Sequence, residues 1–120
     1  LECLVLQPQR ETPSLRRWLV KRGWHLVEES VVLDRGRFYT VMAWKPGAVA
    51  RVWSDLEFQF GPMILAHGGP VARLWLLDEI RHARENLAQM DRRSPGNSRR
   101  VELCSSIDRL AEALERVGSQ

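Results

Sequence analysis

The sequence is poor in lysine and cysteine, and it has no long apolar run. Only Lys21 and Lys45 are lysines among 18 basic residues, so nearly every cation is an arginine. Arginine favours planar, bidentate contacts to phosphate, although GC-rich coding gives the same composition without selection for binding. No stretch approaches the roughly 20 consecutive apolar residues that a membrane-spanning helix needs. The sequence therefore gives no indication of a membrane protein.

The residues that bind metals or catalyse by themselves are also sparse. Cys3 and Cys104 lie far apart, so they fit neither a metal-binding spacing nor a disulfide framework. The three histidines, His25, His67 and His82, are scattered, and we interpret them as surface or edge residues. There is no glycine-rich phosphate loop and no Ser/His/Asp arrangement. We predict no metal site, and the low cysteine content without a visible signal peptide favours a reducing cytoplasm.

The chain opens on a short apolar run that ends at a polar residue and a proline. Cys3 to Leu6 predicts a buried strand, which suggests that the polypeptide begins before Leu1. A helix is predicted to open at Thr12-Pro13-Ser14 and to end at Gly23. Its buried stripe is expected to hold Leu15, Trp18 and Leu19, and its solvated side Arg16, Arg17, Lys21 and Arg22.

Two extended runs follow the helix, over residues 24–33 and 38–44. The turn sequence Asp34-Arg35-Gly36-Arg37 joins them, which predicts an antiparallel hairpin with a positive φ at Gly36. Residues 1–46 are therefore expected to form an α/β unit of strand, helix, strand and strand. A methyltransferase-type Rossmann sheet ends in this order, and other α/β endings fit the same pattern.

Residues 47–69 form an irregular connecting segment, in which Ser54 to Glu57 is a candidate helix cap. From Pro70 onward the apolar residues repeat at spacings of four and three, which predicts an antiparallel coiled-coil hairpin over residues 70–120. The seam residues are Leu76, Ile80, Ala83, Leu87 and Met90 on the first helix, and Leu103, Ile107, Leu110, Leu114 and Val117 on the second. Leu74 and Leu77 widen the first stripe, so that end is expected to pack on the sheet domain or on the 48–69 segment.

The best candidate site is the loop that leaves the first strand. It carries Gln7, Pro8 and Gln9, and ligands of open α/β sheets bind beside the carboxyl ends of parallel strands. A side-chain amide on a rigid loop there is able to hydrogen-bond a nucleobase edge. The alternative is a simple turn at a strand end. The pair Glu28-Glu29 is an acidic candidate. We expect one of the two to be a solvated carboxylate and the other to form a local ion pair, because adjacent strand residues point to opposite faces.

Four arginines flank the loop of the helical hairpin: Arg92, Arg93, Arg99 and Arg100. Together they predict a positive patch that meets phosphates. The alternative is a solvated helix end, where Arg92 and Arg93 complement the dipole of the first helix. Arg99 and Arg100 lie near the start of the second helix, where the dipole disfavours cations, and this favours binding.

The sequence resembles the bacterial tRNA (adenine-22-N1)-methyltransferases, the TrmK family, over most of its length. The motifs that carry the resemblance are, in chain order, Leu4-Val5-Leu6-Gln7-Pro8, Leu15-Arg16-Arg17-Trp18-Leu19, Gly23, Glu28-Glu29, Phe38-Tyr39 and Phe60-Gly61-Pro62 with Leu65. The resemblance weakens in the second terminal helix. Where the family has asparagine after Gln-Pro, this chain has Gln9.

The resemblance implies a class I enzyme that uses S-adenosyl-L-methionine to methylate N1 of adenine 22 in the D arm of tRNA. It implies that this chain is the C-terminal part of such an enzyme, without the half that binds the cofactor, and inactive alone. Gln7, Pro8 and Gln9 would then line the target-base side of the pocket, and the hairpin arginines would contact tRNA. The alternative is a non-catalytic module that binds RNA or a protein through its α/β base and helical hairpin.

Overall fold

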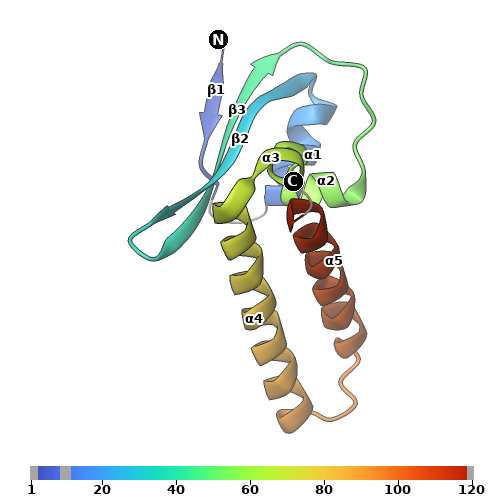
Figure 1. Ribbon diagram of the computed structural model, residues 1–120. Coiled ribbons are helices and arrows are strands. Elements are labelled where there is room, and N and C mark those ends of the chain that lie inside the picture. The colour runs from blue at the N-terminus through green and yellow to red at the C-terminus, as the bar shows by residue number, and fades with distance from the viewer. Residues whose placement is uncertain (1–2, 9–11, 119–120) are drawn as a thin grey trace.

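The computed structural model describes residues 3–8 and 12–118, and this part of the chain is an α/β structure. One sheet lies on one side, short helices cover it, and two long helices project away from it (Figure 1). The projection makes the molecule elongated. Its radius of gyration is 15.7 Å, whereas a compact domain of this length is expected to have about 13.6 Å.

The order of the elements confirms the predicted order of strand, helix, strand and strand, followed by two long helices. The elements are β1 (Leu4–Leu6), α1 (Thr12–Lys21), β2 (Trp24–Asp34), β3 (Arg37–Pro46), α2 (Asp55–Phe60), α3 (Pro62–His67), α4 (Gly69–Arg93) and α5 (Arg100–Gly118). The candidate cap before α2 is also confirmed. The Ser54 hydroxyl accepts a hydrogen bond from the Glu57 amide, and the Glu57 carboxylate accepts one from the Ser54 amide.

Strand β3 lies between β1 and β2 and is antiparallel to both. The hairpin between β2 and β3 turns through Arg35 at φ 51° and Gly36 at φ 77°. Two consecutive positive φ angles define the turn that matches the twist of paired strands, and glycine tolerates this region without strain. The predicted antiparallel hairpin and its glycine turn are therefore confirmed.

The prediction of a buried first strand is wrong. β1 spans only Leu4–Leu6, and Val5 is 67% exposed. The reason is that β1 lies at the edge of the sheet, where within the described residues it pairs only with β3. Leu4 and Leu6 contact the small core under α1, while Val5 points to the opposite face.

The small core under α1 consists of Leu19, Met42 and Trp44, each at most 1% exposed. Leu19 confirms the predicted buried stripe of this helix, but two other predictions for α1 are wrong. Trp18 is 51% exposed, with its ring under the guanidinium of Arg22, and Arg16 is only 1% exposed. The apolar spacing alone predicts a buried face that is centred too close to Trp18. The buried ion pair between Arg16 and Glu29 occupies the other flank of this face.

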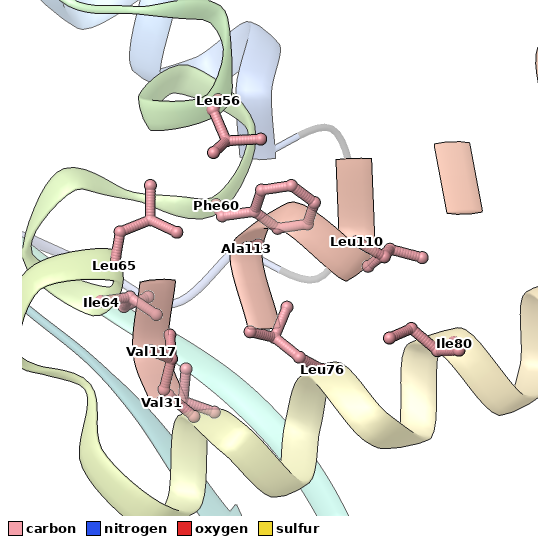
Figure 2. Packing of buried hydrophobic residues seen from close by; sticks show 11 residues of the cluster. Val31, Leu56, Phe60, Ile64, Leu65, Leu76, Ile80, Leu110, Ala113 and Val117 are labelled. Atoms are coloured by element: carbon pink, nitrogen blue, oxygen red, sulfur yellow. The ribbon is translucent and has the colours of Figure 1, made fainter. Parts of the chain in front are cut away.

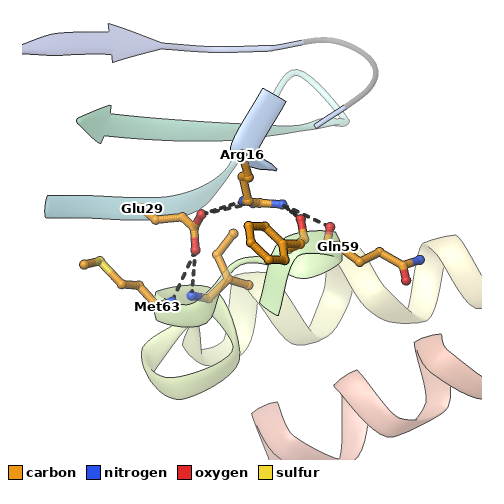
Figure 3. A network of polar contacts seen from close by, with 6 residues as sticks. Arg16, Glu29, Gln59 and Met63 are labelled. Carbon is orange, nitrogen blue, oxygen red and sulfur yellow. Dashed lines mark hydrogen bonds and ion pairs between the residues drawn. The ribbon is translucent and has the colours of Figure 1, made fainter. Parts of the chain in front are cut away.

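The Arg16 side chain connects four elements through one polar network (Figure 3). Its Nε donates a hydrogen bond to Glu29 Oε2 of β2 at 3.0 Å, and its Nη1 donates to the carbonyls of Phe58 and Gln59 in α2 at 3.1 and 3.0 Å. The other carboxylate oxygen, Glu29 Oε1, accepts the amides of Met63 and Ile64 at the start of α3. The expected local ion pair at Glu29 is confirmed, and Glu28 on the other face is exposed.

Burial works against the charges of this pair. Removal from water raises the pKa of Glu29, whereas Arg16 and the two α3 amides lower it. Burial also lowers the pKa of Arg16. Gly61 allows the pair to form, since its φ is 96° and a Cβ there would overlap the Glu29 carboxylate.

The larger core lies where α2, α3, α4, α5 and β2 meet (Figure 2). Leu76, Ile80, Leu110 and Val117 of the predicted helical seam are buried in it. The outer seam residues Ala83, Leu87, Met90, Leu103 and Ile107 are half-buried, and so is Leu114. The two helices thus pack firmly near the sheet and more loosely toward their connecting loop. No helix in residues 3–8 and 12–118 is long and apolar enough to cross a membrane.

The root of α4 packs on the sheet domain and on the 48–69 segment, as predicted, but not through Leu74 and Leu77. They are 50% and 41% exposed. Val71 and Trp75 contact the larger core instead, and the ring of Trp75 meets that of Phe60 edge-on at 6.2 Å. The base of α4 does pack against the sheet domain, but through a stripe rotated away from the predicted one.

Replacing Arg16 with methionine is expected to lower the free energy of unfolding by about 3–5 kcal/mol at neutral pH, because Glu29 stays buried without its partner. The raised pKa of Glu29 means that the folded state binds its proton more tightly than the unfolded chain does. The loss should therefore be smallest below about pH 4.3 and grow as the pH rises. Urea denaturation of the wild type and the variant at several pH values measures this loss in the free energy of unfolding.

The matched control is Arg17→Met. Arg17 pairs with Asp55 at 2.9 Å, but the two side chains are 52% and 92% exposed, so the loss should stay within about 1 kcal/mol. The double variant R16M/E29Q should regain part of the loss, because it no longer buries a lone charge. Equal losses in R16M and R17M would contradict the importance of the buried pair.

Candidate functional site

A cavity of about 390 Å³ lies between one end of the sheet and helix α4. Four segments form it: the loop after β1, the start of α1, the start of β3 and the first half of α4. Its lining residues are Pro8, Thr12, Arg37, Phe38, Tyr39, Thr40, Trp75 and Glu79. Because β3 is antiparallel to β1, the start of β3 and the end of β1 meet at the same edge of the sheet. This is the carboxyl edge of β1, where the sequence predicted a site.

A second cavity, also of about 390 Å³, continues the first between α1, α2, α4 and α5. Thr12, Thr40, Trp75 and Glu79 line both cavities. We refer to the two together as the cleft. Each cavity falls within the range of about 300–1,000 Å³ that ligand sites occupy.

Glu79 is the acidic residue that lines both parts of the cleft. Desolvation raises the pKa of its carboxyl, and the neighbouring Asp78 raises it further, whereas His82 lowers it. The Glu79 carboxylate has no hydrogen-bond or ion-pair partner among residues 3–8 and 12–118, whereas His82 lies 3.6 Å from Asp78. The carboxylate is thus free to accept hydrogen bonds from a ligand.

The predicted residues after β1 differ in their relation to the cleft. Pro8 lines it, Gln7 is exposed and does not line it, and Gln9 lies outside the described residues. Trp75 and Glu79 were missed by the sequence reasoning, which considered only the apolar seam of α4. An aromatic and an acidic residue one turn apart beside that seam are the signal that points to them.

The four predicted arginines gather where α4 ends and α5 begins (Figure 1), and all four are exposed. Arg92 and Arg93 occupy the last turn of α4. Arg100 donates a hydrogen bond from Nε to Asp91 at 3.0 Å, and this contact raises its pKa. Arg92, Arg93 and Arg99 have no ion pair within the described part of the chain, so they retain their full charge for a ligand.

The structure offers no metal centre in the residues that it describes, where no three His, Cys, Asp or Glu side chains gather. Cys3 and Cys104 are free thiols.

The sequence of this chain matches a known protein family. Residues 1–112 match the family model of TrmK, tRNA (adenine(22)-N(1))-methyltransferase. The chain belongs to the TrmK family. No curated protein sequence matches it.

Solved structures of this family share the fold. A candidate tRNA (m1A22) methyltransferase from Streptococcus pneumoniae is 27% identical, with a TM-score of 0.84 over 95% of this chain and 50% of that one. TrmK of B. subtilis is 20% identical, with a TM-score of 0.76 over 93% of this chain and 51% of that one. TrmK of M. capricolum, in complex with S-adenosyl-homocysteine, is 17% identical, with a TM-score of 0.83 over 97% of this chain and 50% of that one. The TrmK chain studied here thus spans about half the length of these structures.

The S. pneumoniae protein has also been solved with S-adenosyl-L-methionine. The described residues of this chain do not fit that cofactor. Dinucleotide and related sites of α/β sheets lie between parallel strands that are followed by glycine-rich turns. Among the described residues each strand pairs only with antiparallel neighbours, and the loop after β1 carries Gln7 and Pro8 in place of glycine.

The 120-residue chain should therefore show no saturable binding of S-adenosyl-L-methionine in isothermal titration calorimetry. Binding in the micromolar range would contradict this and would place a cofactor site within these residues. A thermal melt of the same sample ensures that the chain is folded during the titration.

Proposed function

We propose that this chain is the substrate-binding portion of an S-adenosyl-L-methionine-dependent methyltransferase that acts on N1 of adenine 22 in tRNA. The observation that carries the proposal is the match of residues 1–112 to the family model of these enzymes. The cleft at the carboxyl edge of β1 and the arginines at the hairpin end support it. Methylation of tRNA would place the enzyme in the cytoplasm.

We also propose a division of the chain into three parts. Residues 1–46 would be the end of a class I Rossmann-like sheet, in which an antiparallel strand is inserted between two parallel ones, as β3 is here. Residues 47–69 would connect it to a coiled-coil hairpin over residues 70–120. The exposed edge of β1 would pair with a further strand of the complete sheet, because an unpaired edge otherwise promotes aggregation.

Methylation of adenine N1 requires little proton transfer by the protein. Adenine N1 is unprotonated near neutral pH, so its lone pair is available without a strong general base. The enzyme has to expose a stacked or paired base, align N1 with the methyl donor and exclude water. In this proposal the loop of Gln7, Pro8 and Gln9 lies on the target-base side of the pocket, where Pro8 lines the cleft, and the hairpin arginines hold the tRNA backbone.

The full gene product that contains this chain tests the proposal. Incubated with labelled S-adenosyl-L-methionine and total bacterial tRNA, it should produce 1-methyladenosine at one position of the D arm. Nuclease digestion and mass spectrometry identify the nucleoside and its position. A folded product that binds tRNA without methyl transfer would instead support the alternative, a non-catalytic RNA-binding module.

Replacing Arg92 and Arg93 with alanine in the same full gene product should weaken tRNA binding and reduce its dependence on salt. Each lost phosphate contact lowers the slope of log affinity against log salt by about 0.7–0.9. Replacing Arg99 and Arg100 should have a smaller effect, because Asp91 already compensates Arg100. Filter binding at several salt concentrations measures the slopes.

Lys21→Ala with Arg22→Ala is the matched control. It also removes two adjacent cations at the end of a helix, but on α1, at the opposite end of the molecule from the hairpin loop (Figure 1). This control should leave the slope nearly unchanged. Equal slopes in the wild type and in both arginine variants would show that the hairpin end is only a solvated surface.

A further inference from the structure

The cleft places one aromatic ring and one carboxylate, unpaired within the described residues, on the same side of helix α4. Trp75 and Glu79 are one turn apart, and both line each of the two cavities. The rings of Trp75 and Phe60 lie 6.2 Å apart at an angle of 72°, and this contact holds the indole in place. An aromatic face bounded by an acceptor is the arrangement that single nucleobases bind, by stacking and by hydrogen bonds to their edges.

The charges around the cleft determine which base fits it. Arg16 also lines the cleft, but its guanidinium is committed to Glu29 and to two carbonyls of α2. His82 faces Asp78, and Arg37 lies at the opposite side of the cleft, on β3. Among the charged residues that line the cleft, Glu79 is therefore the one whose carboxylate remains to accept hydrogen bonds from a ligand that carries donors or positive charge.

Adenine offers such a donor, because its exocyclic amino group lies beside N1 on the same edge. Methylation of N1 forms a carbon–nitrogen bond with the lone pair of N1 and leaves the base with a positive charge. A carboxylate beside this edge accepts a hydrogen bond from the amino group and is attracted to the charge that appears. Charge-assisted hydrogen bonds of this kind are about twice as strong as neutral ones.

We propose that the cleft binds the adenine that is methylated, with Trp75 stacking on the ring and Glu79 accepting a hydrogen bond from its amino group. The inference rests on the proposed function and assigns two specificity-determining residues to it. Pro8, in the loop after β1, and Thr12, at the start of α1, line the same space. Arg37, at the start of β3, is placed to meet the phosphate of the same nucleotide.

The test uses the 120-residue chain and two single-stranded RNA pentamers that differ only at the central base, adenine or 1-methyladenine. Fluorescence anisotropy measures the affinity for each. The wild-type chain should bind the 1-methyladenine pentamer about tenfold more tightly, because the carboxylate meets a cation. Glu79→Gln should remove this preference and leave the fold intact, since Glu79 has no partner to lose within the described residues.

Glu115→Gln is the control, because Glu115 is an exposed carboxylate on α5 outside the cleft. It should keep the wild-type preference. Trp75→Ala should weaken binding of both pentamers by about five- to a hundredfold, as loss of one stacking contact does, and Trp75→Phe should restore most of it. Because Trp75 also packs on the larger core, thermal melts of both variants are needed to separate a loss of stacking from a loss of the fold.

A wild-type chain without preference for 1-methyladenine, or a preference that survives in E79Q, would overturn the inference. If tRNA binding still responds to the hairpin arginines, the proposed function stands and only the place of the base is wrong. If the chain binds neither pentamer and the full gene product transfers no methyl group to tRNA, both the inference and the proposed function are wrong.

Discussion

The buried contact between Arg16 and Glu29 is the interaction on which the arrangement of the whole molecule depends. Through it, α1 and β2 are fixed to the carbonyls that end α2 and to the amides that begin α3. Helix α4 follows α3 after Gly68, so the direction in which the long helices leave the sheet is set by the same contact. A buried ion pair stabilises a fold little compared with apolar residues of the same volume, but it allows few other arrangements.

This contact also relates the two cores to the cleft. The core under α1 and the core at the base of the long helices are separate clusters, Arg16 joins α1 to α2, and Arg16 itself lines the cleft. The distance between the end of β1 and helix α4 is thus controlled from within the protein. Our proposal for Trp75 and Glu79 requires such control, because a base is recognised only when its stacking partner and its hydrogen-bond partner keep a fixed separation.

Much of the fold follows from local pattern. The turn at Gly36, the cap at Ser54 and the two long helices each depend on residues a few positions apart, and these predictions are confirmed, whereas the coiled-coil packing of the helices stays a prediction. The errors occur where distant segments decide. Arg16 of helix α1 is buried because it pairs with Glu29 of strand β2, and Val5 is exposed because its strand lies at the edge of the sheet. Likewise, the end of β1 was predictable as one side of a site, whereas Trp75 and Glu79 join it only through the folded chain.

Helix α4 has a consequence beyond packing, since it is continuous from the cleft to the arginines at its far end. At a rise of about 1.5 Å per residue, Glu79 and Arg93 are held about 21 Å apart along its axis. In our proposal the helix therefore sets the distance between the two contacts, and an RNA that touches both ends would present a base and a phosphate at that separation. Shape selection of this kind distinguishes one folded RNA from another without reading its sequence.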